Sequence, residues 1–163
     1  MKPQLALFDC DETLWHSAGR DYISSLPSIL KRADGPAVER SADGQIFSLR
    51  SGVVETFREL HDSGVGIGIV SDNLVAPVIK ALELFGLYRY VKSQAFNVRL
   101  WDGYCNKPQM VEEIIARTRV EPSSVYVFDD KNYRHGMDQI GVHFVQVPEK
   151  EDMNQIVSAS FTY

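Results

Sequence analysis

The chain has 163 residues, of which 44% are hydrophobic and 24% are charged, and its formal net charge is −5. This length predicts a single domain, and the composition is ordinary for a globular protein. The acidic balance argues against broad binding to nucleic acids or to anionic membranes, which require a basic face. A small anionic substrate is still compatible with it, because one local lysine can hold such a substrate.

The cysteine content and the N-terminal residues indicate a cellular setting. The two cysteines, Cys10 and Cys105, form no Cys-x-x-Cys pair, so neither a zinc site nor a disulfide framework is expected. Residues 1–12 reach charged side chains after a few apolar ones, and no segment approaches 20 apolar residues. We therefore expect no signal peptide and no membrane span, and we expect a protein of the reducing cytoplasm.

Short apolar runs in chain order predict the strands of a sheet. The runs occupy residues 5–8, 65–70, 125–128 and 142–147, and residues 90–96 form a weaker fifth candidate. Continuous apolar runs of this length suit strands that are buried on both faces, as in a parallel sheet.

Helical patterns fall between these runs. Three segments carry apolar residues at helical spacing, namely residues 53–61, 74–85 and 108–118. Residues 132–140 and 150–158 are expected to form shorter helices. Strands that alternate with helices predict an α/β fold with a central parallel sheet.

Residues 16–50 interrupt the alternation. We expect a helix over about 20–33, interrupted at Pro27, and then a small hairpin with Asp43 and Gly44 at its turn. The segment is too short to bury a core of its own. We therefore interpret residues 1–163 as one domain with a small insertion at about 16–50.

Polar residues follow three of the predicted strands at the points where the apolar runs end. They are Asp9 and Asp11 after the first run, Ser71, Asp72 and Asn73 after the second, and Asp129 and Asp130 after the run at 125–128. The carboxyl ends of parallel strands lie along one edge of a sheet, where ligands bind. We therefore expect these side chains to meet in space.

The expected meeting of carboxylates requires a positive charge, because uncompensated like charges in one crevice are costly. Oxygen-only ligands favour Mg²⁺, which keeps positions open for a substrate phosphate. Lys107, at a predicted helix start, adds a fixed positive charge, and Ser71 adds a hydroxyl donor. These groups predict a phosphoryl-transfer site in which Asp9 is the nucleophile and Asp11 is the general acid and then the base.

Together these residues resemble a known family. The set Asp-x-Asp-x-Thr at 9–13, Ser71, Lys107 and Asp129-Asp130 is similar in order and placement to the four motifs of the haloacid dehalogenase (HAD) superfamily. "FDCDETLW", "LELFGLYRYV" and "YVFDDKNYR" look most like segments of its magnesium-dependent phosphatase-1 group. The resemblance covers about residues 4–147 and fits poorly at 16–50. It implies a HAD-like, Rossmann-like three-layer sandwich with no large cap domain.

The resemblance also implies an activity and a set of roles. The chain would be a Mg²⁺-dependent phosphatase that hydrolyses small phosphomonoesters, such as a sugar phosphate or a phosphoprotein side chain, through an aspartyl-phosphate. The metal would be held by the Asp9 side chain, the Asp11 backbone carbonyl and Asp130. Asp129 would lie next to these ligands without touching the metal, or would reach the metal through a water molecule. The phosphate would be held by Ser71, Lys107 and the backbone amides of Cys10, Asp11 and Asp72.

One position departs from the group. Its animal members carry an arginine after the motif serine, where this chain has Asp72. An aspartate repels the anionic groups that an arginine would bind, so the substrate preference of those members does not carry over. Glu12 lies at a variable position and is given no catalytic role. The expected partner is a small phosphorylated substrate, with no nucleic acid or membrane, and the chain would be a monomer or a dimer.

Two alternative functions share parts of this pattern. A phosphorylation-switch module like a response-regulator receiver also has an acidic Mg²⁺ pocket, a Ser or Thr and a Lys. Its phosphorylated aspartate follows the third strand, however, and its lysine follows the fifth. A phosphoryl or acyl transferase domain of the HAD superfamily carries a similar Asp-x-Asp-x-Thr-Leu-Trp sequence, although no carrier-protein or acyltransferase segment is recognised in these residues.

Overall fold

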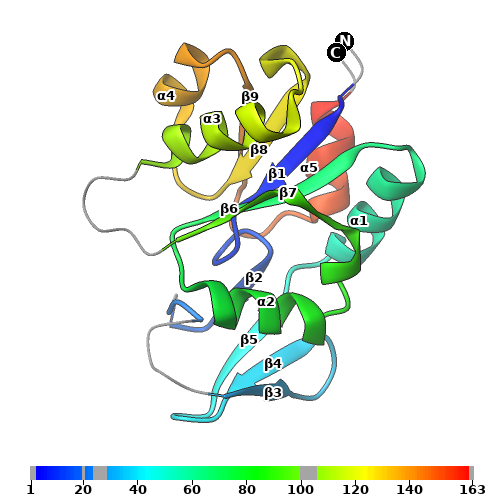
Figure 1. The fold of residues 1–163 in the computed structure, drawn as a ribbon. Helices are drawn as coiled ribbons and strands as arrows, with labels where there is room; N and C mark the ends of the chain where they lie inside the picture. Colours follow the sequence, from blue (N-terminus) through cyan, green and yellow to red (C-terminus); the bar gives the residue numbers. More distant parts are fainter. Residues whose placement is uncertain (1–2, 20, 24–28, 100–105, 162–163) are drawn as a thin grey trace.

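A computed structural model describes residues 3–19, 21–23, 29–99 and 106–161 of the chain (Figure 1). Its centre is a five-stranded sheet with the order β7-β6-β1-β8-β9. Every neighbouring pair in this sheet is parallel. The strands are β1 (Leu5–Phe8), β6 (Gly66–Ser71), β7 (Val91–Val98), β8 (Val125–Asp129) and β9 (His143–Gln146). All five predicted strands are thus confirmed, including the weak candidate at 90–96.

Helices cover both faces of this sheet, so the predicted three-layer α/β architecture is confirmed (Figure 1). The helices are α1 (Val53–Asp62), α2 (Val75–Leu84), α3 (Lys107–Thr118), α4 (Arg134–Gln139) and α5 (Met153–Ser160). Two short 3₁₀ helices, Tyr88–Tyr90 and Pro122–Ser124, precede β7 and β8. Among the described residues, no helix is long and apolar enough to cross a membrane.

The side chains of β1 explain why a continuous apolar run forms the central strand. Ala6 and Phe8 pack into the cluster that contains residues of α1, α2 and α5, whereas Leu5 and Leu7 pack into the cluster under α3 and α4. Successive side chains of a strand point to opposite faces, so a strand covered on both faces needs apolar residues at every position.

The order of the strands distinguishes the HAD-like fold from the receiver-like alternative. Numbered along the chain, the strands of the parallel sheet follow the order 3-2-1-4-5. Receiver domains have the flavodoxin-like order 2-1-3-4-5, in which the first strand is not flanked by the fourth. Here β1 pairs with β8, the fourth strand, so the topology does not support a receiver-like module.

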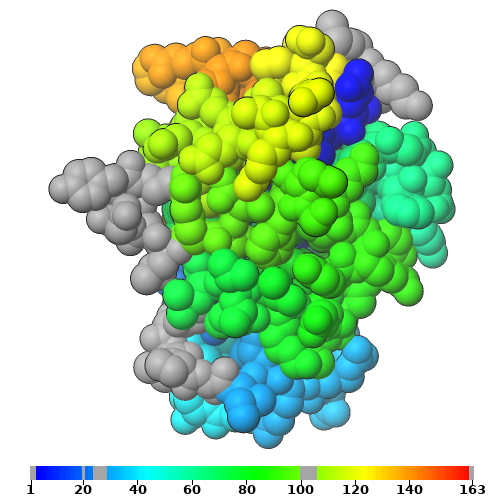
Figure 2. All heavy atoms as spheres, in the orientation of Figure 1, coloured from blue at the N-terminus to red at the C-terminus, as the bar shows by residue number. Residues whose placement is uncertain are grey.

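Residues 15–49 contain a second sheet, which has four antiparallel strands in the order β2-β5-β4-β3. They are β2 (Trp15–Ser17), β3 (Leu30–Arg32), β4 (Ala37–Arg40) and β5 (Gln45–Leu49). This sheet forms one end of the molecule, coloured blue and cyan, next to the green residues around α2 (Figure 2). The insertion therefore contains a sheet that is separate from the central parallel sheet.

The small hairpin in this region is confirmed, since β4 pairs with β5 across a turn that includes Asp43 and Gly44. The helix expected over about 20–33 is wrong at residues 30–32, which form β3. Pairing with β4 decides this conformation, and a strand of three residues is too short to show a period of its own in the sequence. Residues 20 and 24–28 of the expected helix lie outside the described residues.

Candidate active site

The acidic residues after β1 and β8 meet at one edge of the parallel sheet, as the strand ends predict. One carboxylate oxygen from each of Asp9, Asp129 and Asp130 lies within 4.8 Å of the others. The backbone brings them together, because Asp9 N donates to the carbonyl of Phe128 at 2.9 Å and so continues the pairing of β1 with β8. Such an oxygen-rich cluster is suited to a hard divalent cation.

Lys107 lies between two of these carboxylates. Its Nζ is 2.6 Å from Asp9 Oδ1 and 2.8 Å from Asp129 Oδ2, and its side chain is 2% exposed. Burial alone would lower the pKa of Lys107, but the charges of Asp9 and Asp129 outweigh burial and raise that pKa. Lys107 is therefore a permanent cation beside Asp9.

The sequence of α3 explains how Lys107 reaches this position. Asn106 caps the helix by accepting a hydrogen bond from Gln109 N at 2.9 Å, and Pro108 occupies the first turn. Lys107 is the first residue of the helix, so its side chain leaves from the end that faces the strand ends. The expected helix start is confirmed. The lysine contacts Asp9 and Asp129, however, and its expected contact with phosphate stays a prediction.

Asp130 offers the observation that best tests whether a cation fits. Its Oδ1 is buried and accepts no hydrogen bond from any described residue. Burial raises the pKa of the Asp130 carboxyl, and the charge of Asp9 raises it further. A buried carboxylate oxygen without a partner is costly, and a cation bound between Asp9 and Asp130 would remove that cost. The donor set at this edge therefore fits Mg²⁺.

The side chain of Asp11 is oriented by other partners and does not belong to this acidic cluster. Its Oδ1 accepts hydrogen bonds from Trp15 Nε1 at 2.9 Å and from Ile23 N at 3.0 Å. Its Oδ2 accepts a hydrogen bond from Asn73 Nδ2. Only the backbone carbonyl of Asp11 was expected at the metal, and this arrangement leaves that expectation open.

Burial gives Asp11 different acid–base behaviour from an ordinary carboxylate. Desolvation raises its pKa to about 7, the hydrogen bond from Trp15 opposes the rise, and the charge of Asp9 adds to it. A carboxyl group with a pKa near the working pH is suited to donate and then accept a proton. The role of general acid and then base, which the sequence analysis gave to Asp11, stays a prediction.

The residues expected to hold phosphate differ in their burial and in their hydrogen bonds. Ser71 ends β6 and is buried, and its side chain hydrogen-bonds Cys10. Burial raises the pKa of the Cys10 thiol, and the charges of Asp9 and Asp11 raise it further, so Cys10 is a neutral thiol here. Asp72 is partly buried, and its Oδ1 accepts no hydrogen bond from the described residues.

Trp15 and Tyr22 were not predicted as site residues from the sequence. Asn73 and Trp15 both donate a hydrogen bond to the carboxylate of Asp11. Asn73 was among the polar residues expected at the end of the second run, although no role was assigned to it from the sequence. Tyr22 lies in the insertion, and no local pattern connects it with the acidic edge.

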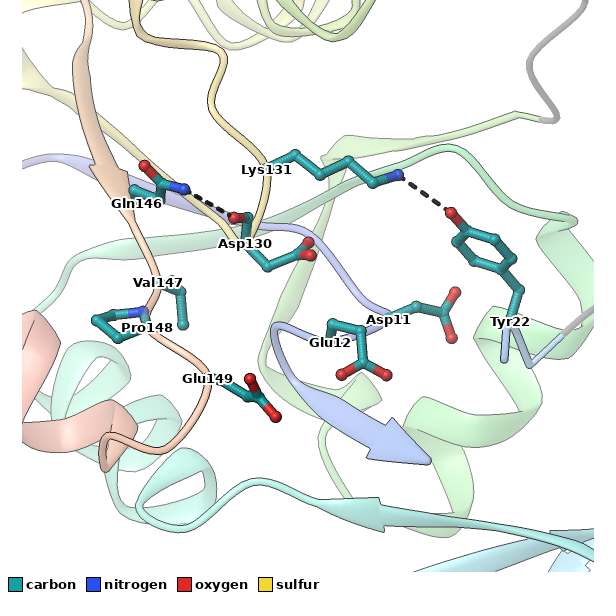
Figure 3. Close-up of a pocket in the computed structure, with 9 residues that line it drawn as sticks. All are labelled: Asp11, Glu12, Tyr22, Asp130, Lys131, Gln146, Val147, Pro148 and Glu149. Carbon is teal, nitrogen blue, oxygen red and sulfur yellow. Dashed lines mark hydrogen bonds between the residues drawn. The ribbon is translucent and has the colours of Figure 1, made fainter. Parts of the chain in front are cut away.

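A pocket of about 600 Å³ opens beside Asp11 and Asp130 (Figure 3). Residues from four parts of the chain line it, namely Asp11, Glu12, Tyr22, Asp130, Lys131, Gln146, Val147, Pro148 and Glu149. Lys131 Nζ is 3.3 Å from Tyr22 Oη, so the loop after β8 contacts the insertion across this pocket. The pocket therefore joins the ends of β1, β8 and β9 to the insertion.

The chain is similar to known proteins in both sequence and structure. Residues 27–132 match the model of a family of hydrolases described as haloacid dehalogenase-like hydrolases. This match spans more than half of the chain and includes Ser71, Lys107, Asp129 and Asp130, while Asp9 and Asp11 precede it. No curated protein matches the chain.

Solved structures share the fold. A HAD-superfamily hydrolase from Ehrlichia chaffeensis has a TM-score of 0.68 at 14% identity, with 98% of this chain and 97% of that chain covered. CbbY from Rhodobacter sphaeroides in complex with phosphate has a TM-score of 0.61 at 14% identity, with 90% and 86% covered. A phosphatase-domain-containing part of a Bacteroides fragilis protein complexed with Mg has a TM-score of 0.60 at 18% identity, with 99% and 40% covered.

Proposed function

Because the chain belongs to the haloacid dehalogenase-like hydrolase family, we propose that it is a Mg²⁺-dependent phosphatase that hydrolyses small phosphomonoesters through an aspartyl-phosphate. The observation that carries the proposal is that two aspartates after the same strand have different surroundings. Asp9 contacts the ammonium of Lys107 at 2.6 Å within an acidic cluster. Asp11 is held apart from that cluster with a pKa of about 7.

The first step of the proposed reaction uses both aspartates. The carboxylate of Asp9 attacks phosphorus, the bond between phosphorus and the ester oxygen breaks, and Asp11 donates its proton to the leaving oxygen. The alcohol departs and the phosphoryl group stays on Asp9. Lys107 neutralises part of the phosphoryl charge from its position beside Asp9.

The second step regenerates the protein. Asp11, now ionised, accepts a proton from a water molecule whose oxygen attacks the phosphorus. The bond between phosphorus and the Asp9 oxygen breaks, which releases inorganic phosphate and restores the Asp9 carboxylate. The same residue thus serves as acid and then as base, which suits a pKa near neutrality.

We propose that Mg²⁺ binds between Asp9 and Asp130, with the Asp11 backbone carbonyl as a further ligand. Asp129 supports the site through Lys107, to which it is bound at 2.8 Å. When bound, the cation supplies positive charge against the acidic cluster and the substrate phosphate. The buried Oδ1 of Asp130, which has no partner among the described residues, supports this assignment.

The finer assignments form part of the same proposal. The three quoted sequence segments favour the magnesium-dependent phosphatase-1 group, and we propose one catalytic domain over residues 1–163 that works in the cytoplasm as a monomer or dimer. We propose Ser71, Lys107 and the backbone amides of Cys10, Asp11 and Asp72 as the phosphate contacts. The substrate would be a sugar phosphate or a phosphorylated protein side chain.

The test is hydrolysis of p-nitrophenyl phosphate by the purified chain with and without Mg²⁺. We expect turnover that requires Mg²⁺ and that Asp9→Asn abolishes, because an amide cannot act as the nucleophile. Asp62→Asn is the matched control, since Asp62 is an exposed residue at the end of α1, and it should retain full turnover. Turnover by Asp9→Asn at the level of the unaltered protein would contradict the proposal.

A further inference from the structure

Arg50 is a buried cation that the proposed reaction does not use. It lies just after β5 and is 5% exposed. Its guanidinium donates hydrogen bonds to the backbone carbonyls of Thr13 at 2.7 Å, Pro148 at 2.8 Å, Glu149 at 2.9 Å, Glu151 at 3.2 Å and Glu12. These carbonyls belong to two separate loops, one after Asp11 and one after β9.

In the described part of the chain, the buried charge of Arg50 is stabilised mainly by hydrogen bonds to backbone carbonyls and not by a carboxylate partner. Burial lowers the pKa of Arg50, and the charges of Glu12, Asp130 and Glu149 only partly oppose that effect. Among the described residues, the hydrogen bonds of its guanidinium all go to backbone carbonyls. A planar guanidinium with five N–H groups can hold several carbonyls in fixed directions. The side chain therefore fastens two loops to each other.

The first of these loops, and the residue that directly precedes the second, contact the backbone of Asp130. Thr13 Oγ1, in the first loop, accepts a hydrogen bond from Asp130 N at 3.0 Å. Gln146, the last residue of β9 and directly before the second loop, donates from Nε2 to Asp130 O at 3.1 Å (Figure 3). The first loop thus holds the N–H of Asp130, and the residue that leads into the second loop holds its carbonyl. Arg50 ties these two loops together.

We propose that Arg50 is a positioning residue that fixes Asp130 for Mg²⁺ binding by holding together the loop after Asp11 and the loop after β9. The inference rests on the proposed metal site. Groups that orient a metal ligand from behind commonly change metal affinity by roughly 10- to 100-fold when they are removed. The same two loops supply Glu12, Pro148 and Glu149 to the wall of the pocket, so Arg50 also sets the separation of that wall.

The test is calorimetric Mg²⁺ binding to the full chain and to Arg50→Lys, without substrate. Lysine keeps the charge, but one ammonium group has three donors and cannot reproduce the fork that holds both loops. We expect the Kd for Mg²⁺ to rise by roughly 10- to 100-fold. Val157→Ala is the control, because Val157 is a buried residue of α5. It should lower the melting temperature and leave the Kd unchanged.

An unchanged Kd in Arg50→Lys, together with a lower melting temperature, would overturn the inference, because Arg50 would then serve only the stability of the fold. Failure of the unaltered protein to bind Mg²⁺ would instead contradict the proposed metal site, and the inference with it. These two failures are distinguishable because the first leaves Mg²⁺ binding by the unaltered protein intact.

If Arg50→Lys does not fold, a variant of Thr13 tests the contact between the first loop and Asp130 directly. Thr13→Val removes the hydroxyl that accepts from Asp130 N while keeping the shape of the side chain. Thr13→Ser keeps that hydroxyl. We expect a raised Kd for Mg²⁺ in Thr13→Val and a Kd near that of the unaltered protein in Thr13→Ser. Equal Kd values in both variants would refute the linkage through Thr13.

Discussion

Lys107 and Asp9 are 98 positions apart in the sequence, yet Lys107 Nζ lies 2.6 Å from Asp9 Oδ1 in a buried contact. The same ammonium is 2.8 Å from Asp129 Oδ2. One lysine therefore compensates two buried carboxylates while no other cation is bound. Removing one partner of a buried ion pair leaves an uncompensated charge, which costs about 3–5 kcal/mol.

Lys107→Met should accordingly destabilise the chain by about 3–5 kcal/mol in the absence of Mg²⁺. Mg²⁺ should stabilise this variant more than the unaltered protein, because the cation then replaces the missing charge. Thermal or urea unfolding with and without Mg²⁺ measures both effects. Lys150→Met, at an exposed lysine, is the control and should change the free energy of unfolding little. An equal Mg²⁺ effect on Lys107→Met and the unaltered protein would count against the compensation.

The raised pKa of Asp11 predicts a pH dependence of activity. The general acid must be protonated, and the pKa of Asp11 is about 7, so kcat/KM should fall as the pH rises through about 7. The hydrogen bond from Trp15 lowers this pKa. Trp15→Phe, which removes the donor, should therefore move the fall in kcat/KM to higher pH. The measurement is kcat/KM for p-nitrophenyl phosphate between pH 5 and 9 at saturating Mg²⁺, roughly two units either side of that pKa.

Two outcomes would contradict the role of Asp11. A fall at the same pH in Asp11→Asn would show that another group causes it. A shift of the Trp15→Phe profile to lower pH would show that Trp15 does not stabilise the ionised carboxylate. Asn73→Asp serves as a further comparison, because a second negative charge beside Asp11 should raise its pKa more than the loss of a neutral donor.

Gly52 predicts a stability effect where α1 begins. Its φ is 77°, and a Cβ there would lie 2.3 Å from Asp152 Oδ1. Asp152 caps α5 by accepting hydrogen bonds from Asn154 N and Gln155 N. Gly52→Ala should therefore cost about 1–3 kcal/mol for the left-handed backbone and a further amount for displacing the cap.

Gly64→Ala is the matched control for this prediction. Gly64 has a similar φ of 76°, but a Cβ there would meet no described atom within 4 Å. It should show only the backbone cost, so urea unfolding should rank Gly52→Ala as clearly less stable than Gly64→Ala. Equal losses would show that the contact with Asp152 relaxes without cost.

Most of the parallel sheet could be predicted because its signals are local. Each buried strand is a continuous apolar run, and β1 needs apolar residues at every position since both of its faces are covered. The insertion could not be predicted in the same way. Residues Leu30–Arg32 become a strand only by pairing with β4, and the local pattern suggested a helix.

The acidic residues at the edge of the parallel sheet were likewise predictable only in part. That Asp9, Asp129 and Asp130 meet follows from the sequence by itself, since parallel strands place their carboxyl ends along one edge. Which partner each side chain takes depends on contacts between distant segments. Only the tertiary structure decided that Lys107 lies between two carboxylates, that Asp11 turns to Trp15 and Asn73, and that Arg50 joins two loops behind Asp130. These side chains come from different elements, so their directions follow from how the elements pack and not from any spacing along the chain.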